Sequence, residues 1–501
     1  MDSFLSAALS ILAGGVALWT TWMWTQWRAP HHLPPGPKPW PIIGNLLDFP
    51  MRDAAQVYVD WAAKCNSNIV HASAFGSHTL ILNKREDAIE LLENRSRKYS
   101  NRPYNPIIDM VGWQGNVALM QYGNFWRLHK KICQQSLRQE AAPLYNPVQL
   151  DKMKLFLRNL LETPEDFERH NKLFSVGIPL GTMYGYDVQG VDDPCVEAAD
   201  ESAFLAVRLL LPGGSILSVF PILRHIPAWF PGAVSRRIAE KARDLTQITM
   251  QVPMENLKKR MAEGPVAPSL VSTFLQERNS AANLSEREEE IVANVAYTVY
   301  GGTFFHLIAT HPEVQKRAQE ELDRIVGSSR LPVFEDREQL PYIEAIYREV
   351  LRWQPPLSLC IPHILSEDDY YKGYFIPKGT AVFANLWAMT HDEEVYKNPH
   401  KFVPERFLDA NGALTKDDRV LAYGFGRRIC VGKHVASSSM WLLMASILAT
   451  FNLGKAQDEH GKDIPINDEY TDANGGFMQH KVHFHCSIKP RSDCVKELFM
   501  V

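Results

Sequence analysis

The segment Tyr423-Gly424-Phe425-Gly426-Arg427-Arg428-Ile429-Cys430-Val431-Gly432 decides how this chain is interpreted. Its glycines lack a Cβ, so the backbone can approach a flat ligand closely and turn amide N–H groups toward the cysteine sulfur. The residues from Lys433 to Leu442 have the pattern of a helix. Cys430 is therefore expected near a helix N-terminus, where a thiolate is stabilised. From this segment alone the alternative is a buried structural cysteine, which is the commoner environment of a cysteine.

The same ten residues resemble the haem-ligand loop of the cytochrome P-450 family, F-x-x-G-x-R-x-C-x-G, with Tyr423 in the place of the first phenylalanine. The resemblance extends from a proline-rich segment near the N-terminus to the end of the chain. It implies a mainly α fold with small β-sheets and a haem b whose iron takes Cys430 as its axial thiolate ligand. Such an electron-rich ligand favours cleavage of a bound O–O bond.

The resemblance also implies which residues contact the haem propionates. Arg428 stands two positions before the ligand, and Trp126 and Lys130 match a W-x-x-x-R helix in which lysine replaces the usual arginine. Lysine keeps the charge and loses the bidentate fork. His363, in Cys360-Ile361-Pro362-His363, matches a further propionate contact. Taken singly, these residues are typical of ordinary surface or structural positions.

Glu349 and Arg352 are three residues apart, which places them on one face of a helix. As an isolated pair they are typical of a surface salt bridge that contributes little to stability. The resemblance adds Arg406, in Pro404-Glu405-Arg406-Phe407, as the third member of a buried network that holds the haem loop. We therefore expect structural support, not catalysis, from these three residues.

The chain departs from the family at the distal helix, where the pattern is A-G-x-D/E-T-T. Gly301-Gly302 is followed at once by Thr303-Phe304-Phe305, so about nine or ten residues, or about 15 Å of helix, are missing. Thr303 is the remaining candidate for the catalytic threonine. Two explanations stay open: an in-frame loss during transcript or gene assembly, or a real variant with altered oxygen activation.

Composition excludes other classes of protein. The net charge is −4 with the two signs interspersed, so no electrostatic footprint for nucleic acid is present. Seven cysteines without a C-x-x-C pair indicate neither a disulfide framework nor a zinc site. No flexible linker follows residue 45, which predicts one haem-binding monooxygenase domain over residues 45–501.

The N-terminus has a different composition from the rest. Residues 3–27 carry no charge, which is long enough for a transmembrane anchor. Arg28 and Lys38 follow it, which predicts a cytosolic catalytic domain, and a cleaved signal peptide is the competing interpretation. Residues 28–44 are rich in proline and predict a semi-rigid hinge. We therefore expect a single-pass protein of the endoplasmic reticulum membrane.

Hydrophobic periodicity predicts several helices and two strands. The predicted helices are Ala54–Cys65, Arg85–Leu92, Phe125–Leu137, Leu150–Leu161, Val196–Leu211 and Val234–Met261, and the predicted strands are Asn68–Phe75 and His78–Leu82.

The resemblance implies a membrane-anchored haem-thiolate monooxygenase that hydroxylates or epoxidises a hydrophobic small molecule in contact with membrane lipid. Fungal secondary metabolism, with a terpenoid substrate, is the expected context. An NADPH-dependent reductase flavoprotein would supply electrons, docking near Lys130, Lys131, Arg427 and Lys433. The alternatives are an oxygen-independent enzyme that uses peroxide or isomerises its substrate, an inactive relative, or a non-enzymatic haem-binding or sensor protein.

Overall fold

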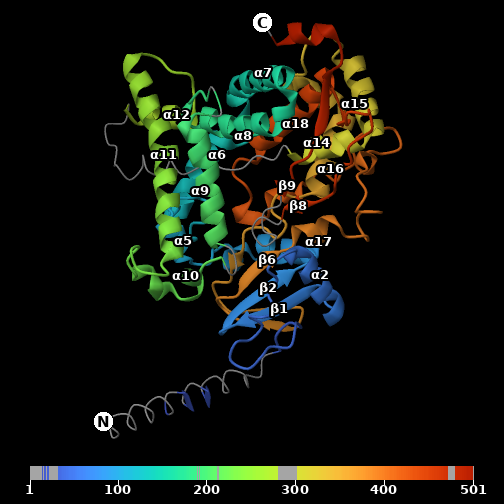
Figure 1. Cartoon of the computed structure of the whole chain (residues 1–501). Coiled ribbons are helices and arrows are strands. Elements are labelled where there is room, and N and C mark those ends of the chain that lie inside the picture. The colour runs from blue at the N-terminus through green and yellow to red at the C-terminus, as the bar shows by residue number, and fades with distance from the viewer. Residues whose placement is uncertain are drawn as a thin grey trace.

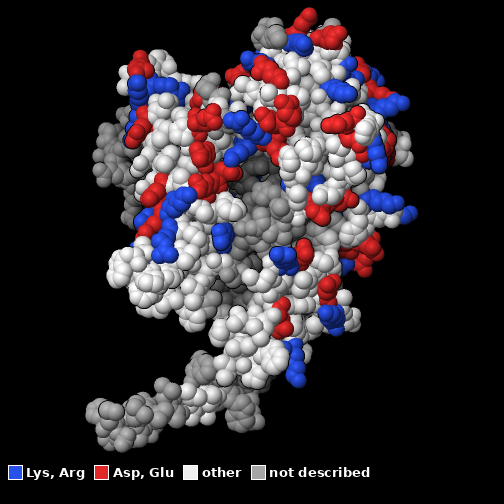
Figure 2. All heavy atoms as spheres, viewed as in Figure 1, with Lys and Arg blue, Asp and Glu red and all other residues white. Residues whose placement is uncertain are grey.

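The structure is a computed structural model that describes residues 14, 16–17, 20–21, 32–188, 190, 192–210, 214–279, 302–471 and 480–499. Over these residues the chain is mainly helical and carries small β-sheets (Figure 1). This confirms the predicted fold class. Acidic and basic side chains are interspersed over the face shown in Figure 2.

The longer helices supply most of the structure. They are α2 (Ala54–Cys65), α6 (Asn124–Leu137), α7 (Asn146–Glu162), α8 (Phe167–Tyr184), α9 (Pro194–Leu210), α11 (Val234–Glu263), α12 (Leu270–Asn279), α14 (Gly302–Thr310), α15 (Pro312–Ile325), α16 (Pro341–Trp353) and α18 (Lys433–Thr450). The shorter helical segments used below are η1 (Ile89–Asn94), η5 (Phe334–Gln339), α17 (Leu386–Thr390), η6 (Pro404–Phe407), η7 (Leu421–Tyr423), η8 (Gly426–Arg428) and η9 (Asp493–Leu498).

The largest sheet has the order β1-β2-β6-β3 and joins two distant parts of the chain. β1 (Ile69–Ala74) and β2 (Ser77–Leu82) form an antiparallel hairpin, whose turn residues Phe75 and Gly76 both have positive φ. A turn of this kind matches the right-handed twist of the two strands. β6 (Ala381–Ala384) then pairs in parallel with β2, and β3 (His363–Ile364) pairs with β6. The sheet therefore joins β3, which carries His363, to the β1–β2 hairpin through β6.

The remaining strands form two-stranded sheets. β4 (Asp369–Tyr371) pairs with β5 (Tyr374–Ile376), β7 (Phe451–Lys455) with β10 (Cys486–Pro490), and β8 (Tyr470–Thr471) with β9 (His480–Lys481).

The main core is built around α18. Residues Met440 to Leu448 of this helix are buried on all sides, which is expected of a helix that is apolar all round. α7, α15 and α16 pack against it (Figure 1). α18 begins three residues after Cys430, at Lys433. The core that holds α18 therefore also fixes the position of the cysteine loop.

The sequence predicted most element positions in the N-terminal half. Ala54–Cys65 and the two strands lie where they were expected. The predicted helix Arg85–Leu92 is divided into a short α-helix and the π-helix η1. No helix was predicted for α8, which contains Pro179, a residue that removes one backbone hydrogen bond and usually indicates a helix end.

The expected transmembrane anchor over residues 3–27 lies almost entirely outside the described residues. Among the helices that the structure does describe, none has both the length and the apolar character to cross a bilayer. A span needs about 20 consecutive apolar residues. This finding contradicts the predicted single-pass localisation in the endoplasmic reticulum membrane, so that prediction is wrong on the present structure.

Candidate cofactor site

The cysteine loop is held by its backbone. The Cys430 N–H donates to the Tyr423 carbonyl at 2.9 Å, which closes the loop just before α18. Gly426 has a φ of 54°, and a Cβ at this position would come within 2.1 Å of the Leu92 carbonyl oxygen of η1. Only glycine tolerates both the left-handed backbone and the close approach. The loop is therefore held close against η1 at Gly426.

The Cys430 side chain is exposed at the surface of this loop. Its pKa is raised because surrounding protein desolvates the thiolate, while the Gly432 N–H and the charges of Lys130 and Lys433 favour the thiolate. A bound metal ion deprotonates a coordinating thiol outright. The position therefore suits a metal–thiolate bond.

Arg428 is directed away from the cysteine and toward the chain before α6. Its guanidinium donates to the carbonyl oxygens of Ser100, Val117 and Met120 at 2.7, 3.1 and 2.8 Å. It also lies 4.3 Å from the centre of the Trp126 ring, and the Trp126 indole N–H donates to the Val117 carbonyl. The structure therefore brings together Arg428 and Trp126 as a stacked pair.

Lys130 projects from α6 to the cysteine loop. Its Nζ donates to the Ile429 carbonyl at 2.9 Å, one residue before Cys430. The pKa of Lys130 falls to about 8, mainly because the ammonium group is buried and in part because Arg428 and Lys433 repel it. Lys130 is thus a buried cation that binds the loop directly.

Arg102 is a member of the site that the sequence did not reveal. It is 4% exposed, and it donates to the carbonyl oxygens of Ala118, Ile361 and Pro362 at 2.7 to 2.8 Å. Burial lowers the pKa of Arg102 to about 10, and burial together with the charge of Arg102 lowers that of Arg428 to about 9. The two guanidinium groups are therefore close enough to repel each other.

His363 lies near Arg102 and Arg428. Its Nδ1 donates to the Tyr99 carbonyl at 2.6 Å, because a carbonyl can only accept. Burial and the charges of Arg102 and Arg428 hold the pKa of His363 well below its usual value. Because Nδ1 already donates to the Tyr99 carbonyl, an anion could bind only at Nε2. Nε2 carries a hydrogen to donate only when the ring is protonated.

Arg102, Arg428 and Lys130 share one property, and we call them the cation cluster. In the part of the chain that the structure describes, no carboxylate forms an ion pair with any of them, and their side chains donate to carbonyl oxygens. Buried cations without a counter-charge are costly. A haem brings two propionates and an iron, which match the cations and the exposed thiol of Cys430. The residues present therefore fit this cofactor.

A second charged group lies behind the loop, and we call it the glutamate network. Glu349 is fully buried and binds Arg352 through both carboxylate oxygens, at 2.6 and 2.9 Å. Arg406 of η6 reaches the same carboxylate at 3.0 Å, and the Val403 N–H donates to it at 2.8 Å. Arg352 also donates to the Thr390 carbonyl of α17. The network thus joins α16, α17 and η6.

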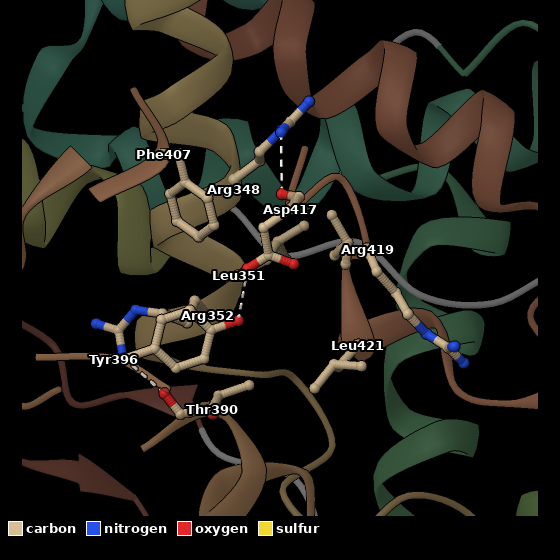
Figure 3. Close-up of a pocket in the computed structure, with 10 residues that line it drawn as sticks. Arg348, Leu351, Arg352, Thr390, Tyr396, Phe407, Asp417, Arg419 and Leu421 are labelled. Carbon is tan, nitrogen blue, oxygen red and sulfur yellow. Dashed lines mark hydrogen bonds between the residues drawn. The ribbon is translucent and has the colours of Figure 1, made fainter. Parts of the chain in front are cut away.

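A small cavity borders this network (Figure 3). Its volume is about 10 Å³, roughly the space of one water molecule. Figure 3 shows the surrounding bonds, in which Arg352 meets Thr390, Tyr396 meets the Asp417 side chain and Arg348 meets the Asp417 backbone. The cavity is too small for a substrate.

Tyr423, the departure from the loop pattern, has a partner of its own. Its hydroxyl lies 2.9 Å from the hydroxyl of Tyr347 on α16. Phenylalanine could not form this bond. The loop is therefore tied to the helix that carries Glu349 and Arg352 by a contact that the motif alone does not reveal.

Thr303 is the next predicted site residue, and its described contacts are not with the cation cluster. It is buried in α14, and its Oγ1 has no hydrogen-bond partner among the described atoms. Phe305, two residues further on, packs against Phe156 and Phe167. α14 packs mainly against β7, β9, β10, α15 and α16. The described contacts thus place Thr303 in the main core and do not bring it to the cation cluster. The segment expected to hold the distal helix before Gly302 lies outside the described residues.

Known proteins of one family are similar to this chain over nearly its whole length. The family model Cytochrome P450 matches residues 34–480. The chain is 36% identical to cytochrome P450 monooxygenase ple1 of Rhodocybe pseudopiperita over 506 aligned residues, which cover 98% of this chain and 96% of that protein. It is 35% identical to cytochrome P450 monooxygenase COX2 of Coprinopsis cinerea, over 93% of this chain and 90% of that protein. It is 36% identical to cytochrome P450 monooxygenase claR of Ampulloclitocybe clavipes, over 93% and 88%. The alignment with ple1 is longer than the chain, so part of ple1 has no counterpart here.

Proposed function

Because the chain belongs to the cytochrome P450 family and is a haem-thiolate monooxygenase, we propose that it oxidises a hydrophobic small molecule of fungal secondary metabolism. A terpenoid is the substrate class that we favour. The bound haem supplies oxygen activation, with electrons from a redox partner. The residues of the chain supply the thiolate, the counter-charges and the rigid support, and each of these roles can be assigned to named side chains.

Cys430 would be the axial ligand, and the loop geometry supports this assignment. The Gly432 N–H and the Lys130 charge both favour the thiolate form. Arg102, Arg428 and Lys130 would hold the propionates, and His363 would join them once its ring is protonated. The single observation that carries the proposal is the cation cluster. Its buried Arg102 and Lys130 and its partly buried Arg428 have no carboxylate partner among the described residues, and Lys130 binds the loop next to Cys430.

Glu349, Arg352 and Arg406 would act as support without touching the cofactor. Their bonds are satisfied within the polypeptide and fix α16 against η6. We also propose that residues 28–44 are a hinge and that residues 45–501 form one domain. The parallel pairing of β2 with β6, which joins Leu80 to Val382, supports the single domain.

An NADPH-dependent reductase flavoprotein is the partner that we propose. Of the four basic residues expected at its docking surface, Lys130 is buried and points to Ile429. It is therefore removed from that set for a physical reason, since a buried ammonium cannot meet a partner. Lys131 and Arg427 are exposed and Lys433 is partly exposed, so these three remain.

A spectrum of the reduced protein with carbon monoxide tests the assignment. Wild type should show the red-shifted band of a thiolate-ligated haem, and Cys430→Ala should lose that band together with product formation. Cys65→Ala, which changes a cysteine remote from the loop motif, is the control and should keep both. Retention of the band in Cys430→Ala would refute the ligand assignment.

The position of Thr303 favours a second candidate, a haem-thiolate enzyme with altered oxygen activation. Thr303 packs in the main core and lacks a described contact with the cation cluster. Turnover with NADPH and a reductase supports the monooxygenase with ordinary oxygen activation. Turnover with hydrogen peroxide, in the absence of NADPH-dependent turnover, supports the second candidate.

A further inference from the structure

Glu93 is a carboxylate that contacts the cysteine loop and is distinct from the glutamate network. Its Oε1 accepts from the Gly426 N–H at 3.1 Å. The same carboxylate binds the Arg419 guanidinium through both of its oxygens, with Nη1 at 3.3 Å from Oε2. Arg419 stands two residues before the start of η7, and Gly426 is the first residue of η8. Glu93 therefore holds the loop at two points, one before η7 and one at η8.

The helix that carries Glu93 has an uncommon form. In the π-helix η1 the Arg95 N–H donates to the Glu90 carbonyl, five residues back, at 3.0 Å. π-helices are rare and are frequently found at functional sites. Two consecutive residues of this helix contact Gly426. The Leu92 carbonyl occupies the space that a Cβ at Gly426 would need, and the Glu93 carboxylate accepts from the Gly426 N–H.

Backbone hydrogen bonds connect Gly426 to Cys430. The Cys430 N–H donates to the Tyr423 carbonyl, and this bond closes a ring that contains Gly426. The Ile429 N–H donates to the Gly426 carbonyl at 3.2 Å, which ties Gly426 to the residue just before the cysteine. A shift of Gly426 therefore moves Ile429, and Cys430 with it.

The contact between Glu93 and the loop is charge-assisted. Burial alone would raise the pKa of Glu93, but the bonds from Arg419 and Gly426 hold this pKa below its usual value. The carboxylate is therefore charged at neutral pH, and a charged acceptor forms a stronger hydrogen bond than a neutral one. The Arg419 guanidinium also lies 5.1 Å from the centre of the Phe425 ring, the residue before Gly426.

From these contacts we propose that Glu93 is a positioning residue for the axial ligand. By holding the Gly426 amide and the Arg419 side chain, it places the loop so that the Cys430 sulfur binds the iron as a thiolate. Glu93 acts through Gly426 and Arg419, without touching the haem. This inference rests on the proposed function, because it takes Cys430 as the haem ligand.

The carbon monoxide complex of the reduced, haem-loaded, full-length protein tests this role, because its absorption distinguishes thiolate-ligated from thiol-ligated haem. Glu93→Ala should raise the ratio of thiol-ligated to thiolate-ligated haem by about tenfold, the effect of losing one hydrogen bond to a charged group. Glu93→Gln keeps the volume and one oxygen acceptor, so its effect should be in the same direction and smaller. This second variant keeps the test decisive if Glu93→Ala fails to fold.

Glu90→Ala is the matched control. Glu90 lies on the same π-helix and also pairs with an arginine, but its described side-chain bonds are to Asn94 and Arg95 and not to the loop. This variant should keep the wild-type ratio of the two haem forms. Urea unfolding of each variant measures the free energy of unfolding separately from ligation.

Wild-type ratios in both Glu93 variants, or equal ratios in Glu93→Ala and Glu90→Ala, overturn the inference. A lower free energy of unfolding with an unchanged ratio also overturns it, because a purely structural role would give that result. In all these outcomes the wild type still shows the thiolate band. Absence of that band from the wild type would instead refute the proposed function, and this inference with it.

Discussion

The cation cluster and the glutamate network are both buried groups of positive charge beside the same loop, yet they differ in one respect. In the network, Glu349 lies between Arg352 and Arg406 and accepts from both. In the cluster, Arg102, Arg428 and Lys130 bind carbonyl oxygens, and no described carboxylate joins them. In the first group both arginines have a carboxylate partner within the polypeptide. The cations of the second group gain such a partner only when they bind an anion, and this separates support from binding.

Removing the carboxylate from the glutamate network should lower the free energy of unfolding, and we expect this to be the largest of the predicted effects. Glu349→Gln leaves two buried arginines without their counter-charge, and breaking a buried pair in this way costs about 3–5 kcal/mol. Urea unfolding should show this loss. Glu320→Gln, at an exposed ion pair with Lys316, is the control and should change the free energy of unfolding by less than about 1 kcal/mol. Equal effects of the two variants would contradict the distinction.

Removing a cation from the cluster should affect the cofactor more than the fold. Arg102→Leu deletes a charge-assisted contact worth about 1.5–3 kcal/mol, so haem should dissociate roughly 10- to 100-fold faster. Transfer of haem to apomyoglobin measures this rate. Arg127→Leu, at an exposed arginine of α6, should release haem like wild type. An unchanged rate in Arg102→Leu would mean that Arg102 does not contact a propionate.

Replacing Lys130 by arginine should change how the haem affinity depends on pH. The pKa of Lys130 is about 8 in the haem-free protein, below the usual value, so the residue loses its charge as the pH rises through 8. Propionate binding requires the charged form, which must then take up a proton. The haem affinity of wild type relative to Lys130→Arg should therefore fall by about tenfold between pH 7 and pH 9, because arginine stays charged.

Haem titrations of the two apoproteins at each pH measure this ratio. Proton release from Cys430 on ligation affects both proteins alike and cancels in the comparison. A ratio that stays constant from pH 7 to pH 9 would show that Lys130 does not contribute its charge to haem binding.

The sequence predicted the residues that belong to compact motifs. Cys430 and Arg428 lie in one decapeptide, and Glu349 and Arg352 share one helix turn. Spacing alone left a structural cysteine and a surface salt bridge open, and the resemblance to a known family supplied the expected roles. Arg102 was missed because its role depends on tertiary contacts with Ile361 and Pro362, about 260 residues away along the chain. The only local signal was an arginine between Asn101 and Pro103, which is typical of many loops.

Other features could not be inferred from local pattern. The hydroxyl pair of Tyr423 and Tyr347 depends on how α16 meets the loop, and periodicity says nothing of that contact. The helix α8 was not anticipated because tertiary packing holds it in place despite Pro179. Thr303 was chosen as the remaining hydroxyl after two glycines. Its burial in α14, next to the core residues Phe304 and Phe305, depends on tertiary packing that the order of residues does not reveal.

The wide separation of the cation cluster along the chain also has a consequence for synthesis on the ribosome. Lys130 meets its carbonyl partner 299 residues later, and Arg428 meets that of Ser100 across 328 residues. The β1–β2 hairpin likewise waits for β6 before its sheet is complete. Chains emerge from the N-terminus, and contacts of long sequence separation form slowly. Cofactor capture is therefore one of the last steps of maturation, and a nascent chain that stalls before Cys430 exposes a half-built pocket to the quality-control machinery.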